Sequence, residues 1–375
     1  MESKSLVSAI RLYKYILKNF WNGRAIIGPD SGHRFELRFL RFIKSHFPSL
    51  NWSDDHFFLQ AQGYWIKSNW DLFEITGDLS YKKVAIACSK QILNKQKNNG
   101  SWEYPLKAWK KYVSTVEGTW ASLGLLETFK HTKELSYLNG ALKWYNFLIN
   151  RIGFQTYKGS LAINYFDTPK WRVPNNTTLV LMFFAELYGI KKNPKFLKFN
   201  DEMIKFIQLS QNNMCARNNG ELRYAVEKEH YLCYHYNAFE FLDLFHYYEI
   251  INDERIRIIL EKLGKFLSTG VTEIGSIKYD CFQTFPENIF YSGVVGAALI
   301  GAASIGFKGY EKHIKHAYDF LFQNQKPEGS FIHSRHDMLY IIKPFEIGFL
   351  TDKRSYPRPL SYILQHLLVK ARSEI

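Results

Sequence analysis

The chain has 375 residues, of which 46% are hydrophobic and 22% charged, and this composition excludes disordered and fibrous classes of protein. Aromatic residues make up 17% of the chain, which suits a cavity whose rings stack on a ligand. The formal net charge of +14 favours an anionic partner, but the basic residues are scattered and form no nucleic-acid motif. We therefore expect an anionic saccharide, or another anionic small or lipid-linked substrate, and no nucleic acid.

The first predicted element is a basic amphipathic helix over residues 6–20. It lacks the continuous apolar segment of a signal peptide, so we predict a cytoplasmic protein. Peripheral contact with a membrane through this basic helix stays an alternative. The most apolar run, residues 291–307, is shorter than the ~20 residues of a membrane span, and we predict that it is a buried helix.

The four cysteines, Cys88, Cys215, Cys233 and Cys281, are far apart in the chain and include no CxxC pair. This spacing predicts individually placed, reduced thiols rather than a framework of disulfides. It agrees with a reducing compartment.

Between the terminal helices the chain repeats itself. Five loops place a glycine two residues before an apolar or aromatic residue, at Gly100, Gly159, Gly220, Gly275 and Gly329. In three of them a glutamine stands four residues before the glycine, at Gln96, Gln155 and Gln325. Successive glycines are separated by 59, 61, 55 and 54 residues. A nearly constant period indicates a repeated supersecondary unit.

Each loop follows an amphipathic stretch and precedes a stretch that is apolar nearly all round, which predicts outer and inner helices respectively. Inner stretches near Asp55, Thr115, Asn175, His235, Ile289 and Asp337 predict six helical hairpins, since short polar turns join antiparallel neighbours. We expect an all-α fold, an (α/α)6 barrel or toroid in a single domain over residues 1–375. Residues 33–350 would form the hairpins, and the terminal helices in 1–32 and 351–375 would pack on the barrel. An open superhelix is the structural alternative.

The QxxxGxW segment of Gln96 to Trp102 and the QxxxGxF segment of Gln325 to Phe331 resemble the QW repeats of the α/α-toroid superfamily of terpenoid cyclases and protein prenyltransferases. Similar segments occur in toroid polysaccharide lyases and glucuronyl 5-epimerases. In glucuronyl 5-epimerases, catalytic tyrosines lie in a loop and at the start of the inner helix that follows it. The segment GELRY, which ends at Tyr224, resembles that loop, and Tyr234 and His235 resemble that helix start. Because fold alone does not imply function, these resemblances supply candidates.

The predicted topology brings the glycine loops and the N-termini of the inner helices to one end of the barrel, where helix dipoles favour an anion. Catalytic candidates at that end are Tyr234, His235, Tyr224 and Glu117. Substrate-binding candidates are Trp102, Trp120, Trp171, Arg172, Asn175, Asn176, His230, Asn237, Arg335 and His336. Two groups have structural alternatives, because Asn175 and Asn176 suit a helix cap and Trp102 suits a wedge between hairpins.

His230, Cys233 and His235 have a spacing that invites a zinc interpretation, but zinc needs three or four ligands and no partner motif is visible, so we predict no metal and no cofactor. Acid–base chemistry by the tyrosines and His235 is the preferred interpretation.

Three functions remain open from the sequence. A terpenoid cyclase would explain the aromatic residues, but the sequence has no DxDD motif, and Asp54-Asp55-His56-Phe57-Phe58 lacks the last carboxylate of DDxxD. A non-catalytic binding toroid is a second alternative. We favour a glycan-active epimerase or β-eliminating lyase on a uronate, with Tyr234 or Tyr224 and His235 as acid and base. In it, Arg172 and Arg335 would neutralise the uronate carboxylate, which the asparagines would orient. Glu117 would favour a hydrolase if a second carboxylate faced it.

Overall fold

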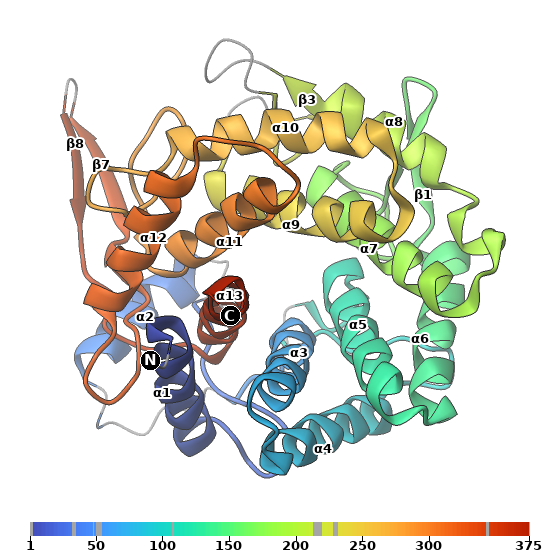
Figure 1. Ribbon diagram of the computed structural model, residues 1–375, viewed down its shortest axis with the longest axis horizontal. Helices are drawn as coiled ribbons and strands as arrows, with labels where there is room; N and C mark the ends of the chain where they lie inside the picture. The colour runs from blue at the N-terminus through green and yellow to red at the C-terminus, as the bar shows by residue number, and fades with distance from the viewer. Residues whose placement is uncertain are drawn as a thin grey trace. The chain divides into compact units, whose positions relative to one another are not determined.

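The computed structural model describes residues 3–31, 35–47, 49, 55–106, 109–212, 220–227, 232–342 and 345–374 (Figure 1). Helices dominate these residues, and the strands among them pair two by two. The chain divides into two compact units: a central unit, Phe58–Phe266, and a terminal unit formed by Met1–Phe57 and Leu267–Ile375. Each unit is described by itself.

The central unit is a row of helical hairpins. Its helices are α3 (Leu59–Thr76), α4 (Leu79–Lys95), α5 (Thr115–Thr132), α6 (Leu135–Phe147), α7 (Pro174–Lys191), α8 (Asn200–Ser210), α9 (Tyr234–Ile251) and α10 (Glu254–Thr269), which reaches the unit boundary. The inner helices α3, α5, α7 and α9 pack side by side in that order, and α4, α6 and α8 each pack on the inner helix before them (Figure 1). The predicted alternation of inner and outer helices is therefore present in this unit.

Burial explains which helices are inner. In α7 the residues from Asn176 to Leu187 are buried without interruption, as expected for a helix surrounded by protein. In α10 the buried residues include Ile256, Ile259 and Leu263, a spacing that covers one face only. The four inner helices also end alike, at left-handed residues Gly77, Lys133, Lys192 and Asn252.

The five glycine loops make the same contact in each repeat. All five glycines have positive φ angles, between 59° and 96°, where a side chain would be strained. A Cβ atom at each position would meet the following outer helix, at Lys143 for Gly100, Lys205 for Gly159, Lys262 for Gly220, His316 for Gly275 and Arg11 for Gly329. Glycine therefore lets each loop lie directly against the next outer helix.

Glutamine side chains tie several loops to those helices. Nε2 of Gln96 donates to the carbonyls of Gly100 and Gly140, and Nε2 of Gln325 donates to those of Gly329 and Ser8. Gln155 instead lies in a strand, opposite Ala162. Gln211 was not predicted, because it stands nine residues before its glycine. Its Nε2 donates to the carbonyls of Gly220 and Ile259.

The terminal unit contains α1 (Lys4–Asn19), α2 (Phe35–His46), α11 (Phe290–Ser304), α12 (Glu311–Asn324) and α13 (Pro357–Glu374). Helix α11 packs on both α12 and α13, and α13 packs on α1. Because the loop of Gly329 rests on α1 as the other loops rest on outer helices, α1 and α13 form a hairpin-like pair of outer and inner helix. They are not the accessory terminal helices that we expected.

The inner helix predicted near Asp337 is wrong. That region forms strands β6 (Ser334–His336), β7 (Met338–Ile342) and β8 (Phe345–Phe349), and β7 pairs with β8. The inner position beside α11 is taken by α13, whose residues Leu360 to Leu368 are buried without a break. Closure of six hairpins into one ring stays a prediction.

Short antiparallel strand pairs lie in the loops between outer and inner helices. Strand β1 (Phe154–Tyr157) pairs with β2 (Ser160–Ile163), β3 (Gln211–Asn212) with β4 (Glu221–Leu222), and β5 (Glu287–Asn288) with β6. The described residues also contain a π-helical turn, Leu148–Ile152, and a 3-10 turn, Pro194–Leu197.

The cysteines differ from their prediction. Cys88 and Cys233 are buried free thiols, whereas Cys281 is disulfide-bonded. The prediction of reduced thiols is therefore wrong for Cys281, which removes the cysteine argument for a reducing compartment. No helix of the described residues combines the length and apolarity that crossing a membrane requires.

Candidate functional site

Aromatic hydroxyls and an imidazole meet where α7 and α9 begin. The ring of Tyr236, in the first turn of α9, lies 4.3 Å from the ring of His235 and 5.1 Å from that of Tyr224. Tyr224 forms a side-chain hydrogen bond with Tyr165, which comes from the loop after β2. We call these four residues the tyrosine–histidine cluster.

Burial keeps two members of the cluster, His235 and Tyr224, in their neutral forms. Burial lowers the pKa of His235 to about 3, because the charged imidazolium would lose its hydration. Burial, and then the nearby Tyr165 and Tyr236, raise the pKa of Tyr224 well above its usual range. At neutral pH, Tyr224 is thus a protonated phenol and His235 a neutral imidazole.

Arg172 lies next to this end of α7 and connects three segments. Its Nε donates to Oε1 of Glu227 at 2.6 Å, and its Nη1 donates to the carbonyl of Thr156 at 3.2 Å. The guanidinium also lies 5.1 Å from the ring centroid of Tyr157. These contacts position a cation at the entrance to α7.

A group of aromatic rings lies in the loops before α5 and α7. Trp109 stacks on Phe166 with ring centroids 5.3 Å apart, and Tyr112 lies at the same distance from Phe166. The ammonium of Lys170 is 4.8 Å from the ring of Tyr112, and Trp171 is 46% exposed. We call these rings and Lys170 the aromatic platform, because stacked rings and a cation suit the faces of sugar rings and an acidic substituent.

Four predicted residues contact the protein framework. Trp102 is buried, and its Nε1 donates to the carbonyl of Ile92 at 2.9 Å, as a structural wedge would. Oε2 of Glu117 accepts the backbone N–H of Gln60 at 3.0 Å, in the first turn of α3. The ring of Trp120 stacks on Tyr64 with centroids 4.0 Å apart. Tyr234 is buried and stacks on Phe266 of α10 at 4.4 Å.

The predicted asparagines lie in the first turns of their helices. Asn175 is partly exposed and Asn176 is fully buried, both at the start of α7. The side chain of Asn237 exchanges two hydrogen bonds with the backbone of Leu222, and so holds the loop before Tyr224 against α9.

Two candidates belong to the terminal unit, and one has no described position. Arg335 has its Nη1 3.7 Å from Oε1 of Glu287, and its guanidinium lies over the ring of Phe320. His336 pairs with Glu287 across β5 and β6, and its ring is edge-on to Phe285. His230 lies outside the described residues.

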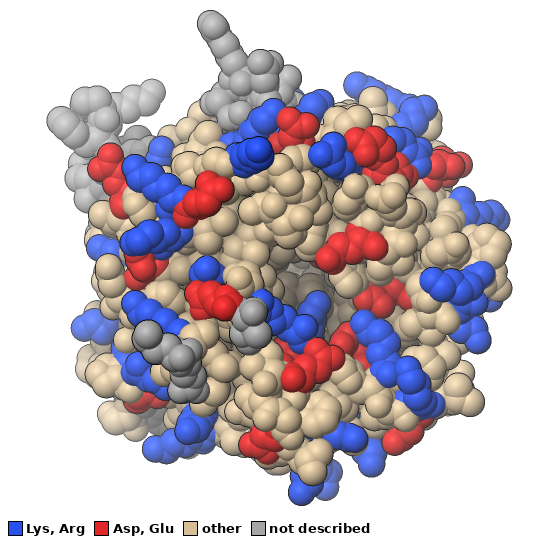
Figure 2. Space-filling view, in the orientation of Figure 1, with Lys and Arg blue, Asp and Glu red and all other residues tan. Residues whose placement is uncertain are grey.

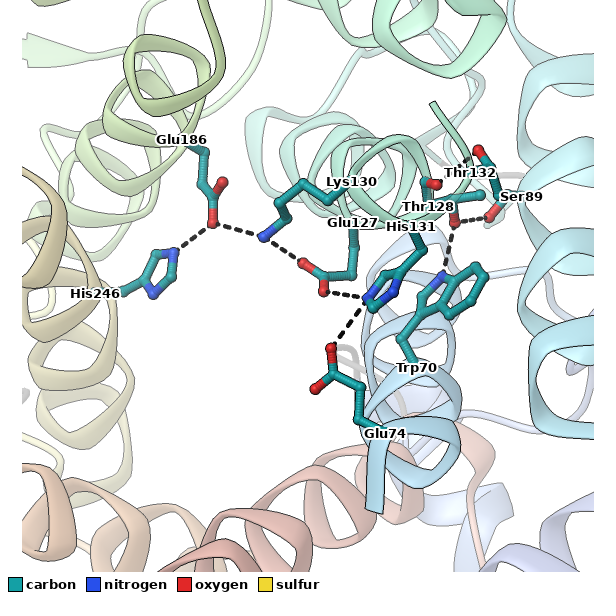
Figure 3. Close-up of polar contacts among 10 residues, drawn as sticks. All are labelled: Trp70, Glu74, Ser89, Glu127, Thr128, Lys130, His131, Thr132, Glu186 and His246. Carbon is teal, nitrogen blue, oxygen red and sulfur yellow. Dashed lines mark hydrogen bonds and ion pairs between the residues drawn. The ribbon is translucent and has the colours of Figure 1, made fainter. Parts of the chain in front are cut away.

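A second polar group lies at the opposite, C-terminal ends of the same inner helices (Figure 3). We call it the charged cluster, and it consists of Glu74, Glu127, Lys130, His131, Glu186 and His246. Nε2 of His246 donates to Oε1 of Glu186 at 2.5 Å, and Nζ of Lys130 lies 3.3 Å from that oxygen. Lys130 also lies 2.5 Å from Glu127. The carboxylates and cations thus alternate from α9 through α7 to α5.

The charged cluster continues to α3 and into the layer of outer helices. His131 contacts Glu74 at 3.5 Å, and its ring is stacked on Trp70 with centroids 4.2 Å apart. Nε1 of Trp70 donates to Oγ1 of Thr128, which is hydrogen-bonded to Ser89 of α4 (Figure 3). This network joins inner and outer helices.

Mutual pairing determines protonation in this cluster. Burial alone would raise the pKa of Glu186, but its hydrogen bond from His246 and the charge of Lys130 outweigh burial and hold the pKa at about 2. Burial would lower the pKa of His246, yet its bonds to Glu186 and Glu249 raise it above the usual value. The sequence signal that we missed is the charged residues in the C-terminal halves of helices whose other residues are mostly apolar.

Surface charge adds little to the choice between these sites. On the face shown in Figure 2, Lys and Arg side chains are interspersed with Asp and Glu side chains and do not gather in one basic patch. The net charge of +14 therefore points to no single surface on that face.

Comparisons with known proteins bear on the fold. No protein-family model and no curated protein sequence matches the chain. Among solved structures, a polysaccharide lyase has a TM-score of 0.67 at 12% identity, over 99% of this chain and 98% of its own. A possible member of glycoside hydrolase family 105 from Klebsiella pneumoniae has a TM-score of 0.70 at 12% identity, over 100% of this chain and 94% of its own.

A third similar structure carries a ligand. It is an inactive variant of an α-1,6-mannanase of family 76 from Salegentibacter, in complex with α-1,6-mannotriose, with a TM-score of 0.65 at 12% identity over 98% of this chain and 99% of its own. At this identity the likenesses show the fold alone: the chain shares a mostly helical fold with these carbohydrate-active enzymes. The terpenoid cyclase alternative gains no support from these three structures.

Proposed function

We propose that the protein is a carbohydrate-active enzyme that removes the proton at carbon 5 of a uronic acid, as an epimerase or a β-eliminating lyase does. The observation that carries the proposal is the tyrosine–histidine cluster. It combines a neutral imidazole on His235 with a protonated phenol on Tyr224, joined through the ring of Tyr236. An acid and a base near one another are the minimum requirement of this chemistry.

In the proposed elimination, His235 accepts the proton from carbon 5. The electron pair of the broken C–H bond forms the double bond between carbons 4 and 5, and the bond from carbon 4 to the glycosidic oxygen breaks. Tyr224 donates its proton to that leaving oxygen, and solvent then returns a proton to Tyr224 and removes one from His235. In the epimerase variant, Tyr224 protonates carbon 5 from the opposite face instead.

Substrate binding follows from the neighbouring groups. Proton removal becomes easier when a cation neutralises the uronate carboxylate, and Arg172 is the proposed cation. Glu227 pairs with Arg172 at 2.6 Å and fixes the guanidinium, at the cost of part of its charge. The aromatic platform supplies the rings on which sugars stack.

Hydrolysis is less well supported, because it needs two carboxyl groups on either side of the glycosidic bond. Glu117 accepts the backbone N–H of Gln60, and Glu227 pairs with Arg172. Both carboxylates therefore have structural tasks. The fold likeness to a polysaccharide lyase and to two glycoside hydrolases supports a carbohydrate-active enzyme and favours neither elimination nor hydrolysis.

The test is incubation of the enzyme with uronate-containing oligosaccharides in deuterated water. An epimerase would place deuterium at carbon 5, and a lyase would produce the ultraviolet absorbance of an unsaturated uronate. The test variant is Tyr224→Phe, and its control is Tyr247→Phe on α9, where the hydroxyl of Tyr247 accepts a hydrogen bond from Nδ2 of Asn200. Turnover of a prenyl substrate with no signal from any uronate would instead favour a terpenoid cyclase.

A further inference from the structure

Three potential metal ligands converge in the terminal unit, after the last glycine loop. They are His333, Asp337 and Asp352, and one ligand atom from each lies within 4.8 Å of the others. Nε2 of His333 is 3.9 Å from Oδ2 of Asp337. His333 and Asp352 are buried and Asp337 is partly exposed.

These separations fit ligands of one ion. Nitrogen and oxygen ligands bind Zn²⁺ at roughly 2.0–2.2 Å, so two ligands of the same ion lie about 3 to 4 Å apart. The 3.9 Å between His333 and Asp337 falls in that interval. The limit of 4.8 Å for the whole set requires only small side-chain adjustments on binding.

The carboxylates are oriented by neighbouring donors. Oδ2 of Asp352 accepts the hydroxyl of Tyr356 at 2.8 Å, and its Oδ1 accepts the backbone N–H of Arg354 at 3.1 Å. Oδ2 of Asp337 accepts the hydroxyl of Ser334 at 3.1 Å. Each carboxylate oxygen has two lone pairs, so an oxygen that accepts one hydrogen bond can still bind an ion. Such outer contacts are a common feature of metal sites.

The backbone holds the three ligands together. The N–H of His333 donates to the carbonyls of Asp352 and Arg354, and the backbones of Ser334 and Asp352 exchange two hydrogen bonds. The ring of His333 also packs edge-on against Tyr356, with centroids 5.1 Å apart. The ligand positions are therefore determined by backbone pairing between the loop after α12 and the segment before α13.

We propose that His333, Asp337 and Asp352 bind one divalent transition-metal ion, Zn²⁺ or Mn²⁺, with water in the remaining positions. A set of one imidazole and two carboxylates suits these ions, whereas Ca²⁺ and Mg²⁺ prefer oxygen ligands alone. Two carboxylates neutralise the charge of the ion in this buried place. The ion joins the loop after α12 to the segment before α13, so it stabilises the terminal unit, independently of the uronate chemistry.

The test uses the full-length protein, stripped of metal by a chelator and titrated separately with Zn²⁺ and Mn²⁺. We expect one equivalent of at least one ion to bind in calorimetry and the thermal midpoint to rise with its concentration. Asp337→Asn and His333→Gln should each weaken binding at least ~10-fold. Asp319→Asn and His316→Gln, on α12 and outside the ligand set, are the matched controls.

Loss of a metal ligand must be distinguished from loss of the fold. Asp337→Asn keeps an oxygen for Ser334 at a partly exposed position, and circular dichroism checks its fold. Co²⁺ offers a direct signature, because an imidazole ligand shifts its visible absorption and His333→Gln would abolish that shift. Equal affinity in wild type and a folded Asp337→Asn variant, or no saturable binding of either ion, would overturn the proposal.

Discussion

The two ends of the inner helices in the central unit differ in how their polar groups are satisfied. At the N-terminal ends, burial keeps Tyr224 and His235 neutral, and the ring of Tyr236 lies against both. At the C-terminal ends, Glu186, Lys130 and Glu127 neutralise one another within 3.3 Å (Figure 3). The same helices therefore carry a cluster suited to proton transfer at one end and a saturated ionic network at the other.

This difference teaches which polar cluster is available for chemistry. A carboxylate held at a low pKa by partners on two helices is a poor acid and a poor base, since its partners would have to be displaced first. Lys130, in the last turn of α5, also interacts favourably with the dipole of that helix. The charged cluster thus stabilises the helix arrangement, and the tyrosine–histidine cluster is the better candidate for catalysis.

The largest effect should follow from the catalytic end. Replacing Tyr224 by Phe removes the proposed proton donor, and we expect the rate of uronate turnover to fall by roughly two to four powers of ten. Steady-state kinetics with a uronate oligosaccharide measures this loss, and the unfolding midpoint should change little. A larger loss for Tyr234→Phe than for Tyr224→Phe would move the proton transfer to Tyr234, although that ring stacks on Phe266.

The next effect should be on stability at the opposite end. Glu186→Gln removes the shared anion between Lys130 and His246 but keeps the shape of the side chain. We expect the free energy of unfolding to decrease by about 2 kcal/mol, less than for a fully buried pair because Lys130 is partly exposed. Urea denaturation measures it, with Glu202→Gln on the exposed face of α8 as the control. Lost turnover with unchanged stability would reverse the assignment of the two ends.

The pH dependence of stability sharpens the same contrast. The pKa of His246 is raised in the folded protein, so its contribution is complete below about pH 6.5 and is lost as the pH rises through the folded pKa. Glu186, with its pKa held at about 2, stabilises above about pH 4.5 and loses this effect in acid. Urea titrations of wild type and His246→Gln should therefore differ most between pH 4.5 and 6.5. A constant difference from pH 5 to 9 would contradict this linkage.

The smallest effect should come from the aromatic platform. Trp171 is 46% exposed, so Trp171→Ala should cost the fold little. If its ring stacks on a sugar, KM should rise a few-fold, a loss of about 1 kcal/mol, with kcat nearly unchanged. Leu209→Ala, at an exposed apolar position on α8, is the control. An unchanged KM would remove Trp171 from the binding surface.

Several features of the fold could be predicted because they depend on neighbours in the chain. Apolar residues on all sides predicted α5, α7 and α9 as inner helices, and the glycine spacing predicted equivalent loops. Gln96 and Gln325 make equivalent hydrogen bonds because their four-residue distance from the glycine is local geometry. The disulfide of Cys281 and the strands near Asp337 could not be found in this way, since both depend on contacts distant in sequence.

The residues of the candidate site also differ in whether the sequence alone could identify them. The sequence pointed to Tyr224 and His235 at the loop and start of an inner helix, but not to Tyr236, which matters only through the rings that it contacts. The charged cluster was missed, because Glu186 and His246 are unremarkable residues until α7 and α9 lie side by side.

By itself, then, the sequence determined the helical repeat, since helix periodicity and the positive φ of glycine are properties of short segments. Tertiary structure alone decided that α13 rather than the segment near Asp337 takes the inner position, and that α1 receives the last glycine loop. It also decided the protonation of His235 and Glu186, which burial and partners from other helices set. The physical reason is that burial and pairing arise only when segments far apart in the chain come together.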